Sequence, residues 1–258
     1  MKLTPGPGET RPHISPSWLR DMEQCGQYWL YKRVERRPYP ASPAMHRGTG
    51  AHAAIQADLA AKRDTGDLLP LEAVREAAAA GVEAAWNRQM TLVTERDGAT
   101  PAEARGRATD TAIAAATAYH EAIAPTVQPA ALEERVRVEL LGYPVDLLGI
   151  IDVREQSGAI RDTKTTGKRP DADAAERSLQ LTAYALARRA LTGAYPPSVH
   201  LDHLVVGKKQ VEPVTQSAAR GDADARSFLL RVERALQAVE REVFLPAPEG
   251  AWNCSQRW

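Results

Sequence analysis

Three strand-like segments follow one another in the middle of the chain, and this succession limits the fold more than any other feature. Residues 134–141 alternate apolar and polar side chains, residues 145–153 form a mostly apolar run, and residues 159–165 form a third segment. Alternation is typical of a half-buried strand, and a continuous apolar run is typical of a buried one. The linkers at 142–144 and 155–158 are short, so the pattern predicts a meander of neighbouring strands.

Helical periodicity dominates the rest of the sequence. Ser15-Pro16 predicts the start of the first helix, because serine is a favoured N-cap and proline fits the first helical turn. The further elements that we predict are a helix from near Gly48, helices over 71–89, 102–123, 170–191 and 222–243, and strands over 199–206 and 210–214. The expected fold class is therefore α/β, with a central mixed sheet of about five strands flanked by helices, and with a helical insertion.

The length of 258 residues suits a single domain of moderate size. An irregular, exposed arm is expected over the first 14 residues. The parts that follow are N-terminal helices over 15–61, a helical insertion over 62–130, the sheet with its crossover helix over 131–215, and a C-terminal helix and tail over 216–258. The alanine-rich insertion carries no obvious chemistry, and we interpret it as a lobe or lid.

Acidic side chains occur on two adjoining strands of the predicted meander. Asp152 closes the apolar strand, and Asp162 lies two residues before Lys164 on the next strand, so the latter two side chains point to the same face. If these strands pair as a hairpin, the two aspartates lie side by side. Close carboxylates repel each other unless a cation lies between them, and oxygen ligands suit Mg²⁺ or Mn²⁺. The carbonyl of Thr163 would offer a further oxygen, and Lys164 would orient or deprotonate an attacking water and stabilise charge on a phosphate.

Three more side chains are candidates for the same site. Gln180 and Tyr184 are four residues apart on the helix after Lys164 and therefore share a face. His52 lies on the helix that includes Gly48-Thr49-Gly50, whose small residues permit close approach to another backbone. Each candidate also has an ordinary structural explanation, since a lone histidine is usually structural and an Asp-x-Lys pair is often a surface ion pair.

The charge balance excludes a protein coated with basic residues. Lysine and arginine total 33, aspartate and glutamate total 33, and the formal net charge is zero. Affinity for a nucleic acid would therefore come from a local groove, for which Lys168 and Arg169 are the best candidates because they follow Lys164 closely. No apolar run approaches the ~20 residues of a membrane span, and the polar N-terminus has no signal-peptide core, so we expect a cytoplasmic protein.

The motifs stand in the order Ser15-Pro16-Ser17 with Cys25, Gly48-x-x-x-His52, Gly149-x-x-Asp152, Asp162-x-Lys164 and Gln180-x-x-x-Tyr184. This order resembles the PD-(D/E)XK nuclease superfamily, and within it the RecB-like nucleases that include the Cas4 exonucleases and the C-terminal domain of AddB. None of the motifs is specific alone, whereas the whole series in this order is. Residues 62–125 carry none of them, and this region tends to vary in the family.

The resemblance implies a restriction-endonuclease-like core and a role for each matched residue. The metal ligands would be His52, Asp152, Asp162 and the carbonyl of Thr163. Lys164 would be the catalytic lysine beside the two catalytic aspartates, and Gln180 and Tyr184 would match a motif similar in position to DNA-contacting residues. The implied reaction is Mg²⁺- or Mn²⁺-dependent hydrolysis of phosphodiester bonds in DNA, by one or two metal ions.

Many of these relatives hold a [4Fe–4S] cluster with four cysteines, one in the first helix and three near the C-terminus. Cys25 would match the first, and Cys254 would match one of the later three. The sequence contains two cysteines, so a four-cysteine cluster is not expected from it alone. Gly26 also stands where a proline often follows the first of these cysteines. Packing on the apolar face of the first helix is the ordinary explanation for Cys25.

The resemblance favours a single-strand DNA exonuclease of recombination, repair or phage DNA metabolism. Its partners would be DNA with single strands or free ends, and recombination, phage or CRISPR proteins. A DNA endonuclease, a non-catalytic DNA-binding or assembly module of the same fold, and a phosphohydrolase of small molecules are the alternatives. Trp18, Trp29 and Tyr31 would stack on unpaired bases, although we expect at least two of them to fill the core.

Overall fold

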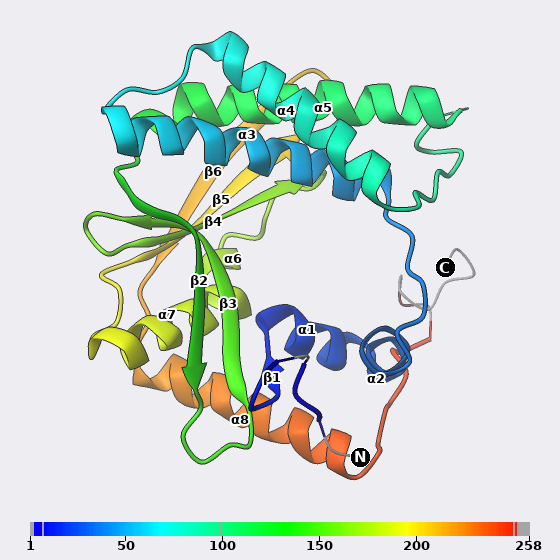
Figure 1. The fold of residues 1–258 in the computed structure, drawn as a ribbon, viewed down its shortest axis with the longest axis vertical. Coiled ribbons are helices and arrows are strands. Elements are labelled where there is room, and N and C mark those ends of the chain that lie inside the picture. The colour runs from blue at the N-terminus through cyan, green and yellow to red at the C-terminus, as the bar shows by residue number, and fades with distance from the viewer. Residues whose placement is uncertain (1–2, 7, 99, 250, 252–258) are drawn as a thin grey trace.

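A mixed sheet with helices on both faces forms the centre of the computed structural model, which describes residues 3–6, 8–98, 100–249 and 251 (Figure 1). The strands are β1 (His13–Ile14), β2 (Pro129–Glu139), β3 (Asp146–Glu155), β4 (Ile160–Thr166), β5 (Val199–Val206) and β6 (Val211–Ala218). The predicted meander is β2, β3 and β4, and the predicted mixed sheet is confirmed. The short strand β1 was not predicted.

The two edges of β3 have different partners. One edge pairs with antiparallel β2 along nearly its whole length. The other edge is shared, because parallel β1 pairs with Asp146 and Leu147, whereas antiparallel β4 pairs with Val153 and Arg154. Between these contacts, no described strand pairs with residues 148–152 of this edge. Beyond β4 the sheet continues with parallel β5 and antiparallel β6. The sheet therefore opens between β3 and β4.

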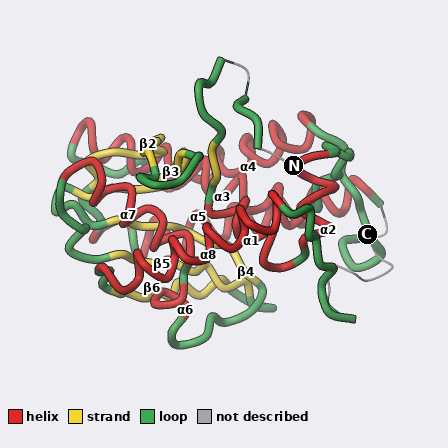
Figure 2. The backbone as a smooth tube through the Cα atoms, turned by 90° about the horizontal axis from the view of Figure 1, so that it is seen from below, coloured by secondary structure: helices red, strands yellow, loops and turns green. Residues whose placement is uncertain are grey.

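Two groups of helices cover the sheet. The longer helices are α1 (Pro16–Gln24), α7 (Leu179–Thr192) and α8 (Asp222–Glu240) on one face, and α3 (Pro43–Thr65), α4 (Leu71–Arg88) and α5 (Pro101–Ala122) on the other. Short helices are α2 (Gly26–Trp29), a π-helix (Leu30–Val34), a 3₁₀ turn (Ala124–Thr126) and α6 (Ala174–Arg177). Seen from below, α1, α7 and α8 lie side by side (Figure 2). Among the described residues, no helix is long and apolar enough to span a membrane.

Three of the long helices begin with the same local signal, a serine or threonine followed by a proline. Ser15, Ser42 and Thr100 each accept a hydrogen bond from the backbone N–H three residues later, at 3.1, 3.3 and 3.2 Å. The prediction for the second helix was therefore wrong at its start. It begins at Pro43 and not near Gly48, because that proline occupies the first helical turn, where its missing N–H costs nothing.

The helix predicted over residues 170–191 is two helices, α6 and α7. Ser178 separates them with an extended backbone, and its Oγ accepts a hydrogen bond from the N–H of Leu181 at 3.3 Å. An N-cap thus lies inside what the sequence pattern indicated as one helix. The last strand also extends beyond its prediction, to Ala218.

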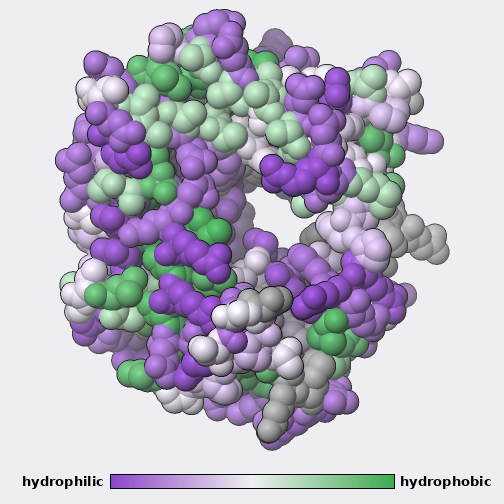
Figure 3. Space-filling view, viewed as in Figure 1, coloured by the Kyte–Doolittle hydropathy of each residue, from purple (hydrophilic) through white to green (hydrophobic). Residues whose placement is uncertain are grey.

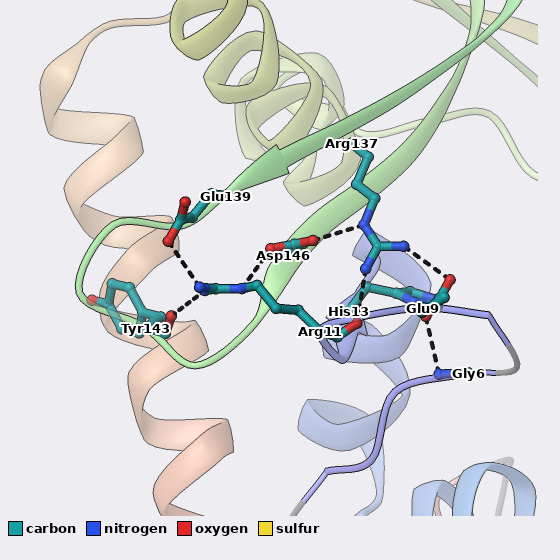
Figure 4. A network of polar contacts seen from close by, with 8 residues as sticks. All are labelled: Gly6, Glu9, Arg11, His13, Arg137, Glu139, Tyr143 and Asp146. Atoms are coloured by element: carbon teal, nitrogen blue, oxygen red, sulfur yellow. Dashed lines mark hydrogen bonds and ion pairs between the residues drawn. The ribbon is translucent and has the colours of Figure 1, made fainter.

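Residues of the predicted N-terminal arm are held against the β2–β3 hairpin by ion pairs (Figure 4). Arg11 Nε lies 3.0 Å from Asp146 Oδ1, and its NH1 lies 2.8 Å from Glu139. Arg137 joins Asp146, at 2.7 Å, to Glu9, at 3.0 Å. Because Asp146 begins β3, these contacts fix β1 beside the start of that strand, and they fix α1, which follows β1, together with it.

Strand β4 is buried although it is largely polar. Arg161 faces the α3–α5 side, where it donates to Glu155 at 2.5 Å and to Asp202 at 3.2 Å, and Thr215 donates to Asp202 at 2.6 Å. A buried charge of this kind is tolerated only when it is paired and hydrogen-bonded. Side chains alternate along a strand, so Asp162 points to the opposite face, toward α1 and α7.

Helices α3 and α4 cross at two glycines. A Cβ atom added at Gly50 would overlap Val82 Cγ2 and would lie 2.7 Å from the carbonyl oxygen of Ala78. One added at Gly81 would lie 3.0 Å from Gly50 Cα. The small residues that precede His52 were predicted to permit such an approach, and Gly50 does so. This crossing packs α4 against the part of α3 that carries His52.

Gly50→Ala is expected to lower the free energy of unfolding by about 1–3 kcal/mol, because it overpacks the crossing. Gly106→Ala is the matched control on an exposed part of α5, where an added Cβ meets nothing within 4 Å. It is expected to be neutral or stabilising by up to about 1 kcal/mol, because alanine favours helix. Chemical denaturation measures both values, and a Gly50→Ala protein as stable as wild type would contradict this packing.

Candidate active site

The candidate residues from the sequence meet where β3 and β4 separate. Asp152 lies at the last position of the unpaired edge of β3, and Asp162 and Lys164 lie on β4. The backbone N–H of Thr163 donates to Asp152 Oδ2 at 2.9 Å. This bond lies next to the Val153–Arg161 pair, where β3 and β4 begin to separate. It therefore holds the Asp152 carboxylate in the gap between the two strands.

The Asp162 carboxylate and the Lys164 ammonium form an ion pair on one face of β4. Lys164 Nζ lies 2.8 Å from Oδ2 and 3.0 Å from Oδ1. The aspartate side chain is fully buried, whereas 39% of the lysine side chain is exposed. Burial raises the pKa of Asp162 to about 6, and the nearby charge of Asp152 adds to this rise while Lys164 opposes it. A buried acid with a raised pKa beside a second acid is typical of functional sites.

A glutamate that the sequence analysis did not single out completes a group of three donors. Single ligand atoms of His52, Glu133 and Asp152 all lie within 4.8 Å of one another. The flanking residues of β2 and β3 pair in register, which leaves Glu133 directly opposite Asp152. Residues opposite each other across two strands share a face. Glu133 also has a positive φ of 47°, which is uncommon for a residue other than glycine.

These donors fit a divalent cation. Burial, followed by the charge of Asp152, raises the pKa of Glu133, and His52 opposes the rise. His52 Nδ1 lies 3.6 Å from Asp152 Oδ2. Opposed carboxylates disfavour each other's ionisation, and a hard cation between them removes that cost. Asp162 interacts electrostatically with both Asp152 and His52 but is bound by Lys164, so it lies beside the three donors rather than among them.

Gln180 and Tyr184 lie on one face of α7, as their spacing predicts, and the glutamine amide donates to the tyrosine hydroxyl at 2.7 Å. The tyrosine ring packs on Gly149, where an added Cβ would lie 2.8 Å from Tyr184 Cε1. Burial holds the pKa of Tyr184 well above its ordinary value, so the phenol stays neutral. Both side chains line a cavity of about 340 Å³ that also contains Lys164 and the free edge of β3.

Other predicted residues lie elsewhere. Lys168 and Arg169 are exposed in the loop after β4, and Arg169 NH1 lies 2.7 and 2.8 Å from the Glu212 carboxylate oxygens, so its charge is already balanced. Neither residue lines this cavity. Trp18 and Trp29 are buried, as expected for the core.

Cys25 is buried, and its Sγ accepts hydrogen bonds from the backbone N–H groups of Tyr28 and Ala247, each at 3.3 Å. Cys254 lies outside the described residues. Two cysteines cannot supply the four thiolates of a [4Fe–4S] cluster, so the residues present do not fit that group.

Comparisons with known proteins identify the family and the fold. The family model described as the PD-(D/E)XK nuclease superfamily matches residues 13–256. Among solved structures, a "putative exonuclease" from Eubacterium rectale aligns with a TM-score of 0.60 at 16% identity, over 98% of this chain and 92% of its own. This likeness indicates a shared fold.

A second structure, SSO0001, aligns with a TM-score of 0.33 at 9% identity, over 86% of this chain and 84% of its own. That score is too low to indicate a shared fold. None of the curated protein sequences matches significantly. The family model covers nearly the whole chain, including the acids and the lysine between β3 and β4, and the chain therefore belongs to the PD-(D/E)XK nuclease superfamily.

Proposed function

We propose that the chain is a metal-dependent DNA nuclease that acts on single strands from a free end. The observation that carries this proposal is the Lys164–Asp162 ion pair beside the three donors His52, Glu133 and Asp152, all at the separation of β3 and β4. The nuclease fold supports it further. The choice of Mg²⁺ or Mn²⁺, and a role in recombination, repair or phage DNA metabolism, stay predictions.

The residues of the site have separate tasks in phosphodiester hydrolysis. A divalent cation held by His52, Glu133 and Asp152 would polarise the phosphate and make water more acidic. The half-exposed ammonium of Lys164 donates to a phosphate oxygen and offsets the charge that develops there. Asp162 is buried behind that ammonium and holds its position through two short contacts.

An opening passes through the molecule between the α3–α4 layer and the part that contains α1, and hydrophilic residues surround most of its rim (Figure 3). Residues 35–42 close one side of it as they run from the π-helix to α3 (Figure 1). Ala41 fastens this segment to the loop after α4, through hydrogen bonds of 2.9 Å to Met90 and 2.8 Å from Leu92. A strand passes through an opening that is closed on all sides only if it enters by its end.

Aromatic and basic side chains occur together near this closing segment. Tyr31 and Tyr39 are exposed, and the Arg37 guanidinium lies 3.9 Å from the Tyr31 ring centre. Lys32 Nζ lies 5.0 Å from the ring centre of Tyr28. Exposed rings interleaved with cations are typical of surfaces that bind single-stranded nucleic acid, because every base can stack. This composition supports a single strand as the substrate.

Lys164→Ala is expected to reduce the rate of DNA cleavage by about 10²-fold or more. The reason is that it removes the ammonium that we propose donates a hydrogen bond to the reacting phosphate. The assay uses end-labelled single-stranded DNA with Mg²⁺, Mn²⁺ or EDTA. Lys208→Ala is the control, since Lys208 is an exposed lysine at the β5–β6 turn. Cleavage by Lys164→Ala at the wild-type rate would refute the assignment. A wild type that binds DNA but never cleaves it would point to a non-catalytic module.

Glu133→Gln is expected to weaken Mn²⁺ binding about tenfold, because it removes one of the charged donors. Isothermal titration calorimetry measures the affinity directly, without reference to cleavage. Glu134→Gln is the matched control on the next residue of β2, where the carboxylate binds Arg154 at 2.8 Å and is not among the metal donors. Equal affinities for both variants would exclude Glu133 from the metal site.

Covalently closed circular single-stranded DNA is expected to resist cleavage, whereas the same molecule cut once is expected to be degraded from its end. The physical reason is the closed opening, which a circle cannot enter. Gel electrophoresis of both forms, incubated with Mg²⁺ or Mn²⁺, gives the result. Cutting of the circle at the rate of the linear form would show an endonuclease instead.

A further inference from the structure

A groove between α1 and α7 runs past Lys164. It consists of the cavity of about 340 Å³ already described and a second one of about 280 Å³. Both are lined by Pro16, Arg20, Lys164 and Gln180, so they adjoin one another at these side chains. The first extends along the free edge of β3, and the second extends toward α6 and the start of α7. A strand whose phosphate reaches Lys164 therefore has space on both sides of it.

The charged side chains that line this groove are all cationic. Its cationic residues are Arg20, Lys164 and Arg177, and no aspartate or glutamate lines either cavity. Lys164 is paired with Asp162, and Arg177 lies 3.3 Å from Asp171. Arg20 differs from both, because its guanidinium makes no hydrogen bond or ion pair with any described residue and its side chain is exposed. Of the three cationic residues that line the groove, Arg20 is thus the one without a carboxylate partner among the described residues.

The position of Arg20 is fixed although its side chain is free. It lies on α1, between the buried core residues Leu19 and Asp21, and Asp21 is bound by Arg33 at 2.7 Å. Helix α1 is joined directly to β1, which the arm contacts fix beside β3. A guanidinium presented from a fixed helix into a groove without acids suits a phosphate, which it binds through paired N–H donors.

We propose that Arg20 binds a backbone phosphate of the single strand next to the phosphate that contacts Lys164, and so positions the strand in the groove between α1 and α7. This inference rests on the proposed function, since it assumes that the strand lies along this groove. Arg20 is a positioning residue and not a catalytic one. It holds the substrate at a phosphate that does not react, so its loss should act on binding more than on the chemical step.

The test measures binding of a fluorescent 20-nucleotide oligothymidylate by anisotropy, in EDTA to prevent cleavage, over a series of salt concentrations. Arg20→Ala is expected to bind several-fold more weakly than wild type, and the slope of log Kd against log salt concentration should fall by about 0.7, the value for one phosphate contact on a single strand. Arg20→Lys should keep most of the slope, because it keeps the charge, but only part of the affinity.

Arg226→Ala is the matched control. Arg226 is also an exposed helical arginine without a hydrogen bond or ion pair to any described residue, but it lies on α8 and lines neither cavity. The Arg226→Ala substitution removes the same net charge as Arg20→Ala. It should leave the affinity for the oligonucleotide and the slope of log Kd against log salt concentration unchanged. Steady-state cleavage gives a second readout, in which Arg20→Ala should raise KM several-fold and change kcat little. Thermal melting confirms that the variants are folded.

The outcomes separate the two proposals. If wild type cleaves DNA, and Arg20→Ala matches it in affinity, salt slope and KM, then Arg20 does not bind a backbone phosphate. The nuclease proposal stands in that case. Equal losses in Arg20→Ala and Arg226→Ala would mean that net charge alone is responsible, and would also overturn it. If wild type neither binds nor cleaves the oligonucleotide, the proposed function fails and the inference about Arg20 fails with it.

Discussion

The site depends on the free edge of β3 between its contacts with β1 and with β4. A strand edge inside a sheet is normally completed by its neighbour. Here β1 occupies only the start of the edge, where Arg11 and Arg137 converge on Asp146, and β4 pairs only near the far end. Residues 148–152 of this edge therefore have no strand partner among the described residues, and Leu148, Gly149 and Ile150 line the cavity. Gly149 leaves room for the Tyr184 ring on the face of the strand that α7 covers, and Asp152 at the end of the free edge accepts a backbone N–H across the gap.

The acids collected at this edge have an electrostatic cost. Glu133 and Asp152 face each other across the β2–β3 ladder, and Asp162 is buried beside them. Lys164 balances only one of these charges. Burial and mutual repulsion raise the pKa values of Glu133 and Asp162, which means that folding holds these groups where their ionised forms are disfavoured. Such an arrangement gives up stability, and a divalent cation bound by these donors would restore it.

The parts of the fold and of the site that depend only on local periodicity could be predicted from the sequence. Asp162 and Lys164 share a face because strands repeat every two residues, and β5 has the bounds that were predicted for it. Glu133 was missed because its place depends on the register of the β2–β3 hairpin, which alternation does not give. Its positive φ also cannot be inferred from a glutamate. Arg20 was missed because its surroundings are set by distant contacts of the N-terminal arm. The start of the second helix was predicted near Gly48 instead of at Pro43 because proline occurs both in loops and at helix starts.

Contacts with the segment after α8 hold α1 and α2 beside the site. The resemblance to the RecB-like nucleases raised the expectation of a four-cysteine cluster between the first helix and the C-terminal region, which the two cysteines of this sequence cannot supply. Here Gly26 donates its N–H to the Leu245 carbonyl at 2.8 Å, and the Trp29 ring stacks on Phe244 with centroids 5.5 Å apart. A Cβ at Gly26 would lie 2.9 Å from Leu245 N, so a proline in that position would push the segment away. The glycine after Cys25 is therefore the residue that lets two backbones meet, and packing with hydrogen bonds joins the two regions among the described residues. Because α1 carries Arg20 and lines the groove beside Lys164, this joint fixes one wall of the site through ordinary folding interactions.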